Sequence, residues 1–424
     1  MTREQVRTAD ERPWWRVGLL WIVVPAGLCL VGLVASGLRL SPPSLVRPAA
    51  AQSVLPAAQQ VGPRERAEPA FEPDEIEAIG RLGPWPPPLT PDPSNRASGS
   101  PDAATLGRLL FADPRLSPDG AVACTTCHDP ERAFADGLPR SRARVEGRRN
   151  APGLVDVRFN RWFGWDGGDD TLWAMSLRPI LDPREIGGSI AGLASLLRSD
   201  HELSAGYARA FSRAPAAVSD AALAVDAAKA LAAFQETLVS PRTPFDAFRD
   251  ALVAGDAAAA AKFPAAARRG ARLFVGRGNC ALCHGGPTLS HGEFADVGVP
   301  FFTADGVDSG RHGGLKALRD SPYTLLGPWS DDPARSTAMP TRHVEPQHRN
   351  FGEFRVPSLR GVAATAPYMH DGSKATLRDV VHHYSTLDLD RLHADGETIL
   401  KPLGLSESEI DDLVAFLEAL SPAP

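Results

Sequence analysis

The hydrophobic positions of this chain recur mostly at helical spacing. That spacing predicts helices at 219–239 and 263–274, and a last helix that begins after Ser406. Glu409 stands three residues after Ser406, as in a capping box. The apolar residues that follow share one helical face: Ile410, Leu413, Val414 and Leu417. Alternating apolar and polar positions, which are typical of strands, are nearly absent. The pattern therefore predicts an all-α fold.

A longer apolar run marks the N-terminal region. Residues 17–38 carry no charged side chain, and a helix of about 20 apolar residues can cross a bilayer. More arginines precede the run than follow it: Arg3, Arg7, Arg12 and Arg16 against Arg39 and Arg47. The positive-inside rule then places the body of the chain on the periplasmic side of the inner membrane. We expect a transmembrane anchor at 1–40, with a cleaved signal segment as the alternative.

The composition changes after this run. Residues 41–100 are rich in Pro, Ala, Ser and Arg, which favours extended backbone over a packed core. The rest of the chain is long enough to bury two cores of ordinary domain size. We therefore expect a linker at 41–100, an N-terminal domain at 101–255 and a C-terminal domain at 256–424.

A weak internal repeat indicates that the two domains are related. In the first half, Gly107, Leu110 and Phe111 precede Cys-Thr-Thr-Cys-His at 124–128. In the second half, Gly270, Leu273 and Phe274 precede Cys-Ala-Leu-Cys-His at 280–284. Each half is thus similar to one cytochrome c unit.

A Cys-x-x-Cys-His run can bond a haem through both thiols and place its histidine on the iron. A redox-active Cys-x-x-Cys motif typically lies near a βαβ unit, and its chemistry does not require the histidine that follows here. A zinc site needs four ligands that close on one ion, whereas these runs lie far apart in the sequence. We therefore expect two covalently bound haem c groups. The attachment residues are Cys124, Cys127 and His128 for the first haem, and Cys280, Cys283 and His284 for the second.

The charge balance excludes one class of partner. The net charge is −6 and long Lys/Arg runs are absent, so the chain offers no basic face for nucleic acid phosphates. The fifth cysteine, Cys29, lies in the apolar run and is interpreted as a small membrane-facing residue.

The first haem has no second imidazole nearby. No histidine occurs between His128 and His201, and the only methionine in that stretch is Met175. A cytochrome that only carries electrons usually closes the sixth position of its iron with a second strong ligand, whereas an open position permits chemistry. This gap indicates an open first site.

Several phrases of the sequence resemble the bacterial di-haem cytochrome c peroxidases and the MauG-like enzymes of methylamine utilisation. They are LGRLLFADPRLSPDGAVACTTCHDP, RRNAP, WFGWDGG, FQETLVSPRTPFD, FRVPSLRGVAATAPYMHDG and TLRDVVHHY, within roughly residues 101–420. The resemblance implies two cytochrome c-like haem domains and hydrogen peroxide as the oxidant.

The resemblance also implies roles for single residues. By position, Trp165 matches a tryptophan between the haems, Glu185 the distal acid at the first haem, and Pro179 a neighbouring pocket proline. Glu185 would take a proton from the near oxygen of peroxide and return it to the far oxygen as the O–O bond breaks. The residues that match a structural calcium site are Asn150, Thr365 and Pro367.

At the second haem, Tyr384 falls where peroxidases have a methionine ligand and MauG-like members a tyrosine. Met369 and the two histidines before Tyr384, His382 and His383, are alternatives. An anionic phenolate ligand would stabilise higher oxidation states of iron. The resemblance has two departures: Met175 replaces a glutamine beside the distal acid, and Gly168 replaces an arginine. The loop at about 303–350 is also longer than in the plain peroxidases.

Three functions stay open. In the first, peroxide withdraws electrons from the haem pair, which a small periplasmic cytochrome c or cupredoxin refills. In the second, the electrons come from Trp or Tyr side chains of a partner protein, as in MauG-like enzymes. In the third, the protein is a membrane-anchored electron carrier or sensor, with both irons six-coordinate and Glu185 dispensable.

Overall fold

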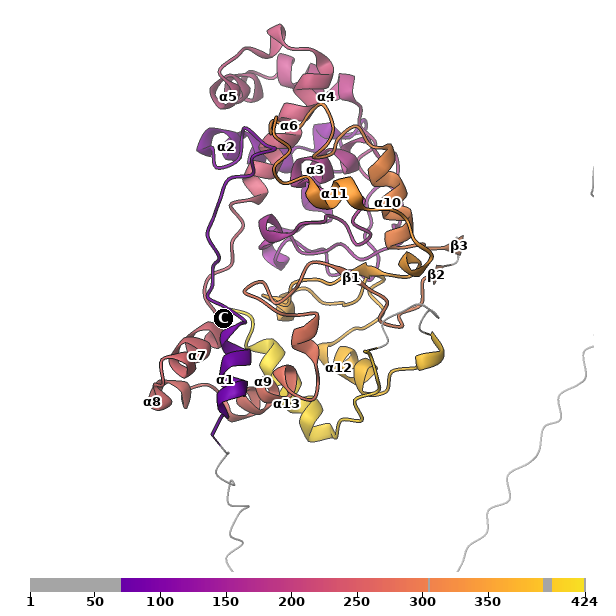
Figure 1. The fold of residues 1–424 in the computed structure, drawn as a ribbon. Coiled ribbons are helices and arrows are strands. Elements are labelled where there is room, and N and C mark those ends of the chain that lie inside the picture. The colour runs from indigo at the N-terminus through magenta and orange to yellow at the C-terminus, as the bar shows by residue number, and fades with distance from the viewer. Residues whose placement is uncertain (1–69, 304–305, 392–398, 423–424) are drawn as a thin grey trace, which may run out of the picture. The chain divides into compact units, whose positions relative to one another are not determined.

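The described part of the chain is mostly helical (Figure 1). The computed structural model describes residues 70–303, 306–391 and 399–422. Two short antiparallel ladders accompany the helices: β1 (Phe294–Ala295) pairs with β4 (Phe354–Arg355), and β2 (Phe302–Thr303) with β3 (Gly306–Val307). The predicted all-α fold is wrong in this respect. Each strand has two residues, too few for an alternating pattern to show in the sequence, and tertiary contacts bring the partners together.

The predicted membrane-spanning helix is not among the elements of the structure. Within the ranges given above, no helix is both long enough and apolar enough to cross a bilayer. The apolar run at 17–38, and with it the anchor predicted at 1–40, lies outside the described residues. The predicted architecture is therefore corrected to a mostly helical body with two small β-ladders.

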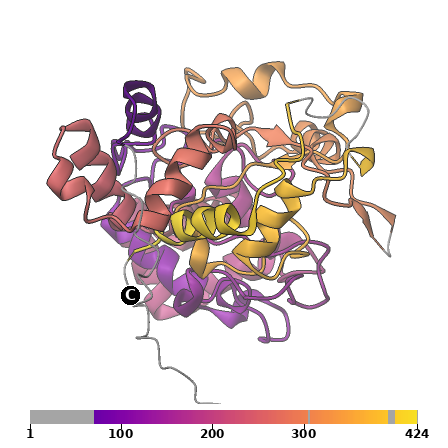
Figure 2. The same ribbon diagram turned by 90° about the horizontal axis from the view of Figure 1, so that it is seen from below.

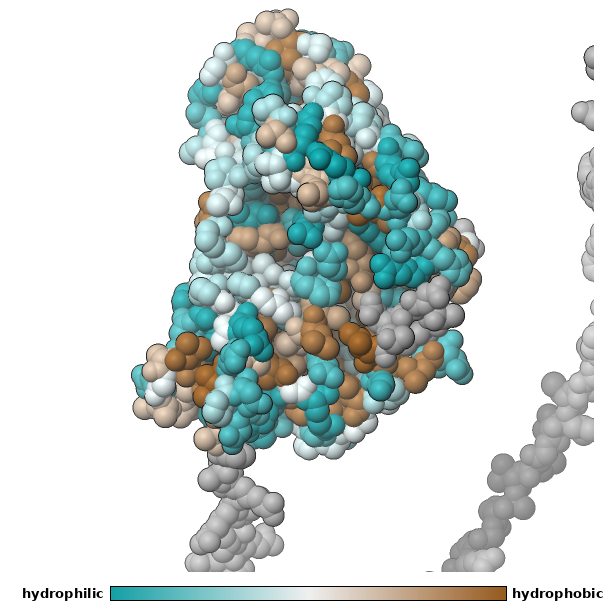
Figure 3. Space-filling model, in the orientation of Figure 1, coloured by the Kyte–Doolittle hydropathy of each residue, from teal (hydrophilic) through white to brown (hydrophobic). Residues whose placement is uncertain are grey.

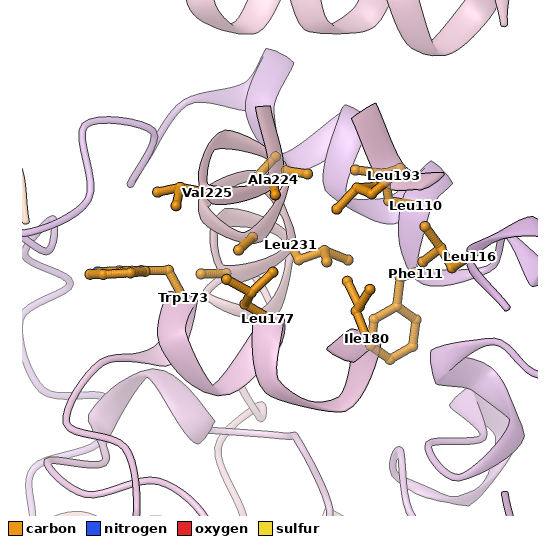
Figure 4. Close-up of a cluster of buried hydrophobic side chains, with 14 of the residues drawn as sticks. Leu110, Phe111, Leu116, Trp173, Leu177, Ile180, Leu193, Ala224, Val225 and Leu231 are labelled. Carbon is orange, nitrogen blue, oxygen red and sulfur yellow. The ribbon is translucent and has the colours of Figure 1, made fainter. Parts of the chain in front are cut away.

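The first hydrophobic core lies among α2 (Pro101–Phe111), α3 (Leu172–Leu181), α4 (Ile190–Ser199), α5 (His201–Phe211) and α6 (Asp220–Gln235). Helices α2, α3 and α4 pack against α6, which is buried almost all round. Figure 4 shows side chains from these four helices meeting in the core. The helix predicted from residue 219 is confirmed, because the Ser219 hydroxyl caps α6 by accepting a hydrogen bond from the Ala222 backbone N–H.

The second hydrophobic core lies among α1 (Pro73–Gly80), α7 (Pro244–Val253), α9 (Ala265–Val275), α12 (Leu377–Ser385) and α13 (Glu407–Glu418). Helix α13 packs against α9 and α12 (Figure 2), and its predicted capping box is confirmed. A short helix, α8 (Ala257–Ala260), follows α7. On the face shown in Figure 3, apolar side chains gather around α7 and α8. The described residues thus form two large, separate cores, while the haem-domain limits at 101–255 and 256–424 stay a prediction.

The weak internal repeat has a packing reason. On α2, a Cβ atom at Gly107 would overlap the carbonyl oxygen of Ala230 in α6. On α9, a Cβ atom at Gly270 would overlap the carbonyl oxygen of Asp412 in α13. Only glycine permits such a close approach of two backbones. Apolar residues that follow the glycines are buried in the cores: Leu110, Phe111 and Phe274.

Residues 71–97 pack against the body of the protein, although their composition predicted a linker at 41–100. Helix α1 buries Ile79 in the second core. The Trp85 indole N–H donates to the Ser240 carbonyl oxygen at 3.0 Å. A Pro-rich stretch can pack in this way because single large side chains anchor it, and composition averages over such positions.

The segment at 303–350 packs on the first core, although it follows the second haem motif in the sequence. It contains α10 (Arg311–Asp320) and α11 (Met339–His343), which lie beside α3 in Figure 1. The carboxylate of Asp170, just before α3, accepts a hydrogen bond from the Thr341 hydroxyl at 2.7 Å. Tyr323 and Trp329, which lie between α10 and α11, pack against the first core.

Removal of the Arg360 guanidinium should destabilise the fold. Arg360 donates two hydrogen bonds, of 2.9 and 3.1 Å, to the Asp246 carboxylate, and the two side chains are 1% and 0% exposed. Arg360→Ala would leave that carboxylate buried without its cationic partner, so we expect a loss of about 3–5 kcal/mol in the free energy of unfolding. Denaturant unfolding of the intact protein measures it. Arg378→Ala, which removes exposed pairs with Glu407 and Asp411, is the control and should leave the midpoint unchanged. Equal shifts would contradict the prediction.

Candidate functional site

The first Cys-x-x-Cys-His run forms a short 3-10 turn at Cys124–Thr126. His128 Nδ1 lies 2.9 Å from the Phe134 carbonyl oxygen. Because a carbonyl oxygen can only accept, Nδ1 carries the proton and Nε2 keeps its lone pair. Burial lowers the pKa of His128 and keeps the ring neutral. A neutral imidazole that is oriented through its other ring nitrogen is the form that ligates iron.

The second run repeats this arrangement. Residues Cys280–Leu282 form a 3-10 turn. His284 Nδ1 lies 3.2 Å from the Leu289 carbonyl oxygen, and burial lowers the pKa of His284 to about 4. In both runs, therefore, Nδ1 of the histidine is held by a backbone carbonyl oxygen.

The four cysteines of these runs are not joined in disulfides. Burial raises the pKa of Cys124 and of Cys280 to about 12, and that of Cys127 to about 11. Thiols with such pKa values stay protonated, which disfavours a redox-active pair. Among the described residues, no group of three or more His, Cys, Asp or Glu side chains could hold a metal ion. The two runs fit covalent haem attachment and do not fit a zinc site.

A cavity of about 910 Å³ adjoins the second motif. Cys280, Cys283 and His284 line it, and it extends to Trp165 and Phe134. The carbonyl of Phe134 orients the histidine of the first motif. The cavity therefore reaches from the surroundings of the first motif to the second one.

Tyr384 and Met369 both line this cavity. The two competing histidines are not part of its lining: His383 Nε2 donates to the Val297 carbonyl oxygen at 2.8 Å, and His382 is exposed. Burial raises the pKa of the Tyr384 phenol above its ordinary value. Of the candidates named from the sequence, Tyr384 and Met369 are the ones that face the second motif.

Trp165 also lies on the wall of the cavity. Its indole N–H donates to the Asn150 carbonyl oxygen at 2.9 Å. Its own carbonyl oxygen accepts a hydrogen bond from the Arg355 backbone N–H at 2.8 Å. The indole and the backbone are thus fixed by different segments of the chain.

Glu185 lies in the loop after α3, and two backbone hydrogen bonds fold this loop back onto the helix. The Glu185 N–H donates to the Asp182 carbonyl oxygen at 3.0 Å, and the Ile186 N–H donates to the Pro179 carbonyl oxygen at 3.1 Å. Pro179 stands in the last turn of α3. The structure therefore brings the two predicted pocket residues, Pro179 and Glu185, close together.

The Glu185 carboxyl group lies near the first motif. Its charge acts on the thiols of Cys124 and Cys127. The side chain has an exposed face, but the surrounding protein desolvates the carboxyl enough to raise the pKa of Glu185, while the positive charge of Arg178 opposes this shift. A carboxyl group whose pKa is raised holds a proton more readily than a fully solvated one, which suits an acid as well as a base.

The two departures from the family pattern are linked through Arg178. A Cβ atom at Gly168 would lie 2.9 Å from Arg178 Nη1, so the glycine leaves room for this guanidinium. Arg178 Nη2 donates to the Met175 Sδ atom at 3.1 Å. Helix α3 therefore places Arg178 beside Gly168, where the family pattern has an arginine. Arg178 also donates a hydrogen bond to Met175, which replaces the expected glutamine.

A second cavity, of about 460 Å³, lies between α3 and the long loop, and Asp169, Arg178 and Tyr323 line it. Asp169 Oδ2 lies 3.1 Å from Arg178 Nη1. Burial raises the pKa of Asp169 to about 6, and Arg178 opposes the shift. Sequence reasoning missed these three residues, because they lie apart in the sequence and only tertiary packing brings them together.

The predicted calcium residues come from two neighbouring segments. Asn150, Thr365 and Pro367 all line the large cavity. The Asn150 backbone N–H donates to the His370 carbonyl oxygen at 2.8 Å, which joins the segments. They offer amide and carbonyl oxygen atoms, the ligand type that Ca²⁺ prefers.

Known proteins share both the sequence and the fold. The family model for di-haem cytochrome c peroxidase matches residues 101–253. The methylamine utilization protein MauG of Methylorubrum extorquens is 36% identical over 327 residues, 77% of this chain and 80% of that protein. The cytochrome-c peroxidase IdrP1 of Denitromonas iodatirespirans is 35% identical over 356 residues, 80% of this chain and 86% of that protein.

Two solved structures add the fold. A MauG-like protein associated with microbial copper homeostasis matches with a TM-score of 0.62 and 27% identity, over 80% of this chain and 96% of that one. The diheme peroxidase BthA of Burkholderia thailandensis matches with a TM-score of 0.60 and 25% identity, over 79% and 88%. These matches span both haem motifs, which the geometry shows to be equivalent. The chain belongs to the di-haem cytochrome c peroxidase family, whose members are oxidoreductases with two c-type haems.

Proposed function

We propose that this protein reduces hydrogen peroxide at the first haem site, and that the second haem site stores or relays the electrons. The observation that carries the proposal is the position of Glu185, a carboxyl group with a raised pKa beside the first motif, in a chain with no histidine from residue 129 to 200. The relatives include proteins named cytochrome-c peroxidase, which supports the reaction class.

Glu185 serves as the acid and base of the reaction. A haem held by Cys124, Cys127 and His128 would supply a redox-active iron at this site. Glu185 takes the proton from the near oxygen of peroxide and returns it to the far oxygen, which leaves as water. The positive charge of Arg178 favours the Glu185 carboxylate between these two transfers. Pro179 shapes the wall beside the carboxyl group.

Trp165 carries electrons between the two sites. The indole lines the cavity that reaches from Phe134 to His284. Its fixed hydrogen bond to the Asn150 carbonyl supports this role, because a mobile ring would give no constant path.

Tyr384 would hold the iron of a second haem together with His284, with Met369 as its competitor. Both line the cavity beside Cys280 and Cys283. A phenolate favours stored oxidising equivalents, whereas a thioether raises the potential of a haem. This tyrosine favours the second candidate function, in which Trp or Tyr side chains of a partner protein are oxidised, as the relatives named MauG suggest.

The remaining partners follow from the same chemistry. If the protein is a peroxidase, a small periplasmic cytochrome c or cupredoxin returns electrons to the haem pair. Ca²⁺ would be held by Asn150, Thr365 and Pro367, and it would join the segments beside Trp165. An electron carrier or sensor is disfavoured by a carboxyl group placed beside the first motif, and a high-spin ferric population in the absorption spectrum would argue against it directly.

Glu185→Gln should leave both haems attached but slow the reaction with peroxide by about 10²- to 10⁴-fold, because an amide cannot shuttle the proton. Stopped-flow mixing with peroxide measures the rate. The exposed Glu202→Gln on α5 is the control and should react as the wild type does. A rate for Glu185→Gln equal to that of the control would remove Glu185 from the mechanism.

Tyr384→Phe should change the ligand field at the second iron and shorten the life of the two-electron-oxidised protein, because the phenyl ring cannot coordinate. Magnetic resonance and near-infrared spectra report the ligand field. His382→Ala alters an exposed neighbour on α12 and should leave the spectra unchanged. If Tyr384→Phe also leaves them unchanged, the tyrosine only packs and Met369 becomes the ligand to test.

The all-ferric protein should react with one equivalent of peroxide without a reductant, because residues 129–200, which follow the first motif, contain no histidine that must first be displaced. Met175 should not block the iron, since its thioether already accepts a hydrogen bond from Arg178. Absorption spectra after mixing decide the matter. A spectral change that appears only after an electron is supplied would contradict the prediction, and Met175→Gln would then show whether the thioether is the gate.

A further inference from the structure

The turn at 164–168, which carries Trp165, is enclosed by residues that belong to neither haem motif. On one side, the Arg355 backbone N–H donates to the Trp165 carbonyl oxygen. On the other side, the start of α10 lies directly against the turn: a Cβ atom at Gly314 would overlap the carbonyl oxygen of Asp166. Contact this close leaves the turn no room to move towards α10.

Arg311, the first residue of α10, makes the most specific contacts with this turn. Its Nη1 donates to the Gly167 carbonyl oxygen at 2.8 Å. Its guanidinium lies 4.2 Å from the ring centre of Trp162 and 3.9 Å from that of Phe294. The side chain is 4% exposed. A buried planar cation that stacks on two rings and donates to a backbone carbonyl has one well-defined position.

Asp308, in the segment just before α10, adds a second link between α10 and the turn at 164–168. Its carboxylate accepts two hydrogen bonds of 2.7 Å from Arg149, and Arg149 Nη1 lies 2.7 Å from Asp166 Oδ2. Asp308 also accepts a hydrogen bond from the Gly310 backbone N–H at 3.1 Å, which fixes the start of α10. The side chain of Asp166 and the backbone of the turn are thus both tied to one segment, 308–314.

We infer that Arg311, with Asp308, is a positioning residue that fixes Trp165 between the two haem sites and thereby sets the rate at which electrons pass between them. The inference rests on the proposed function. Peroxide takes up two electrons and two protons to give two waters, and the path through Trp165 delivers one of these electrons from the second site to the first. Such transfer weakens steeply when the ring shifts, so a residue that fixes the ring acts on the rate without touching the reactants.

The test uses Arg311→Gln in the full-length, haem-loaded protein. Hydrogen–deuterium exchange of the peptide that spans 162–170 should increase, because the turn loses its donor from α10. Electron exchange between the sites, followed by absorption after one equivalent of peroxide, should slow by about 10- to 10²-fold. Arg311→Lys keeps the charge and should recover part of the rate. Arg319→Gln, an exposed arginine on the same helix, is the matched control and should change neither readout.

A double-mutant cycle separates positioning from a general structural effect. If Arg311 acts through the indole, Arg311→Gln should cause no further slowing in a Trp165→Phe background. Equal slowing in both backgrounds would overturn the inference, as would unchanged deuterium exchange at 162–170 in Arg311→Gln. If the wild-type protein does not react with peroxide, the proposed function fails, while deuterium exchange still tests whether Arg311 fixes the turn.

A second pair of variants covers the case in which Arg311→Gln does not fold. Gly314→Ala should push α10 away from the Asp166 carbonyl and slow electron exchange. Gly313→Ala, one residue earlier, would meet only the Ser309 hydroxyl, which can rotate away, and should behave as the wild type. Equal electron-exchange rates in the two alanine variants would also overturn the inference.

Discussion

The position of Arg149 is the constraint on which the rest of the site depends. Its guanidinium lies between the carboxylates of Asp166 and Asp308, which come from segments far apart in the sequence. Burial alone would raise the pKa of Asp166, but Arg149 and Arg178 hold it below its ordinary value. Loss of the arginine would leave two acidic groups without this partner, and a partly buried network of this kind tolerates such a loss poorly. The next residue, Asn150, accepts the indole hydrogen bond of Trp165, so the ion pairs and the proposed electron path share one piece of backbone.

The two halves of the molecule have related local structures. Each half places a glycine where two helices touch through their backbones, and each orients the histidine of its motif through a carbonyl oxygen a few residues later. The surroundings of the motifs differ. The first motif adjoins a carboxyl group with a raised pKa, whereas the second adjoins a cavity with a tyrosine and a methionine. Similar haem sites can therefore carry different chemistry, because the groups opposite the histidine decide what reaches the iron.

Arg178 opposes the negative charges near the first haem motif. Arg178 acts on Glu185, pairs with Asp169 and donates to the thioether of Met175. It does so from α3, in space that Gly168 leaves free. The long loop adds Tyr323 to the same surroundings. These residues surround the carboxyl group that is proposed to act on peroxide.

The sequence by itself determined the features that are local. A Cys-x-x-Cys-His run is complete within five residues, and the Ser406 cap needs only Glu409, so both could be recognised without a fold. Features that depend on distant partners could not. The β1–β4 ladder joins residues far apart in the chain, each strand is too short to show alternation, and the prediction of an all-α fold was therefore wrong. Trp85 anchors a segment whose Pro-rich composition predicted a linker, because burial depends on where Ser240 lies. The roles of Asp169, Arg178 and Arg311 arise in the same way: their charges are typical of solvent-exposed residues, and only tertiary packing buries them beside the site, where desolvation and opposite charges give them their effect.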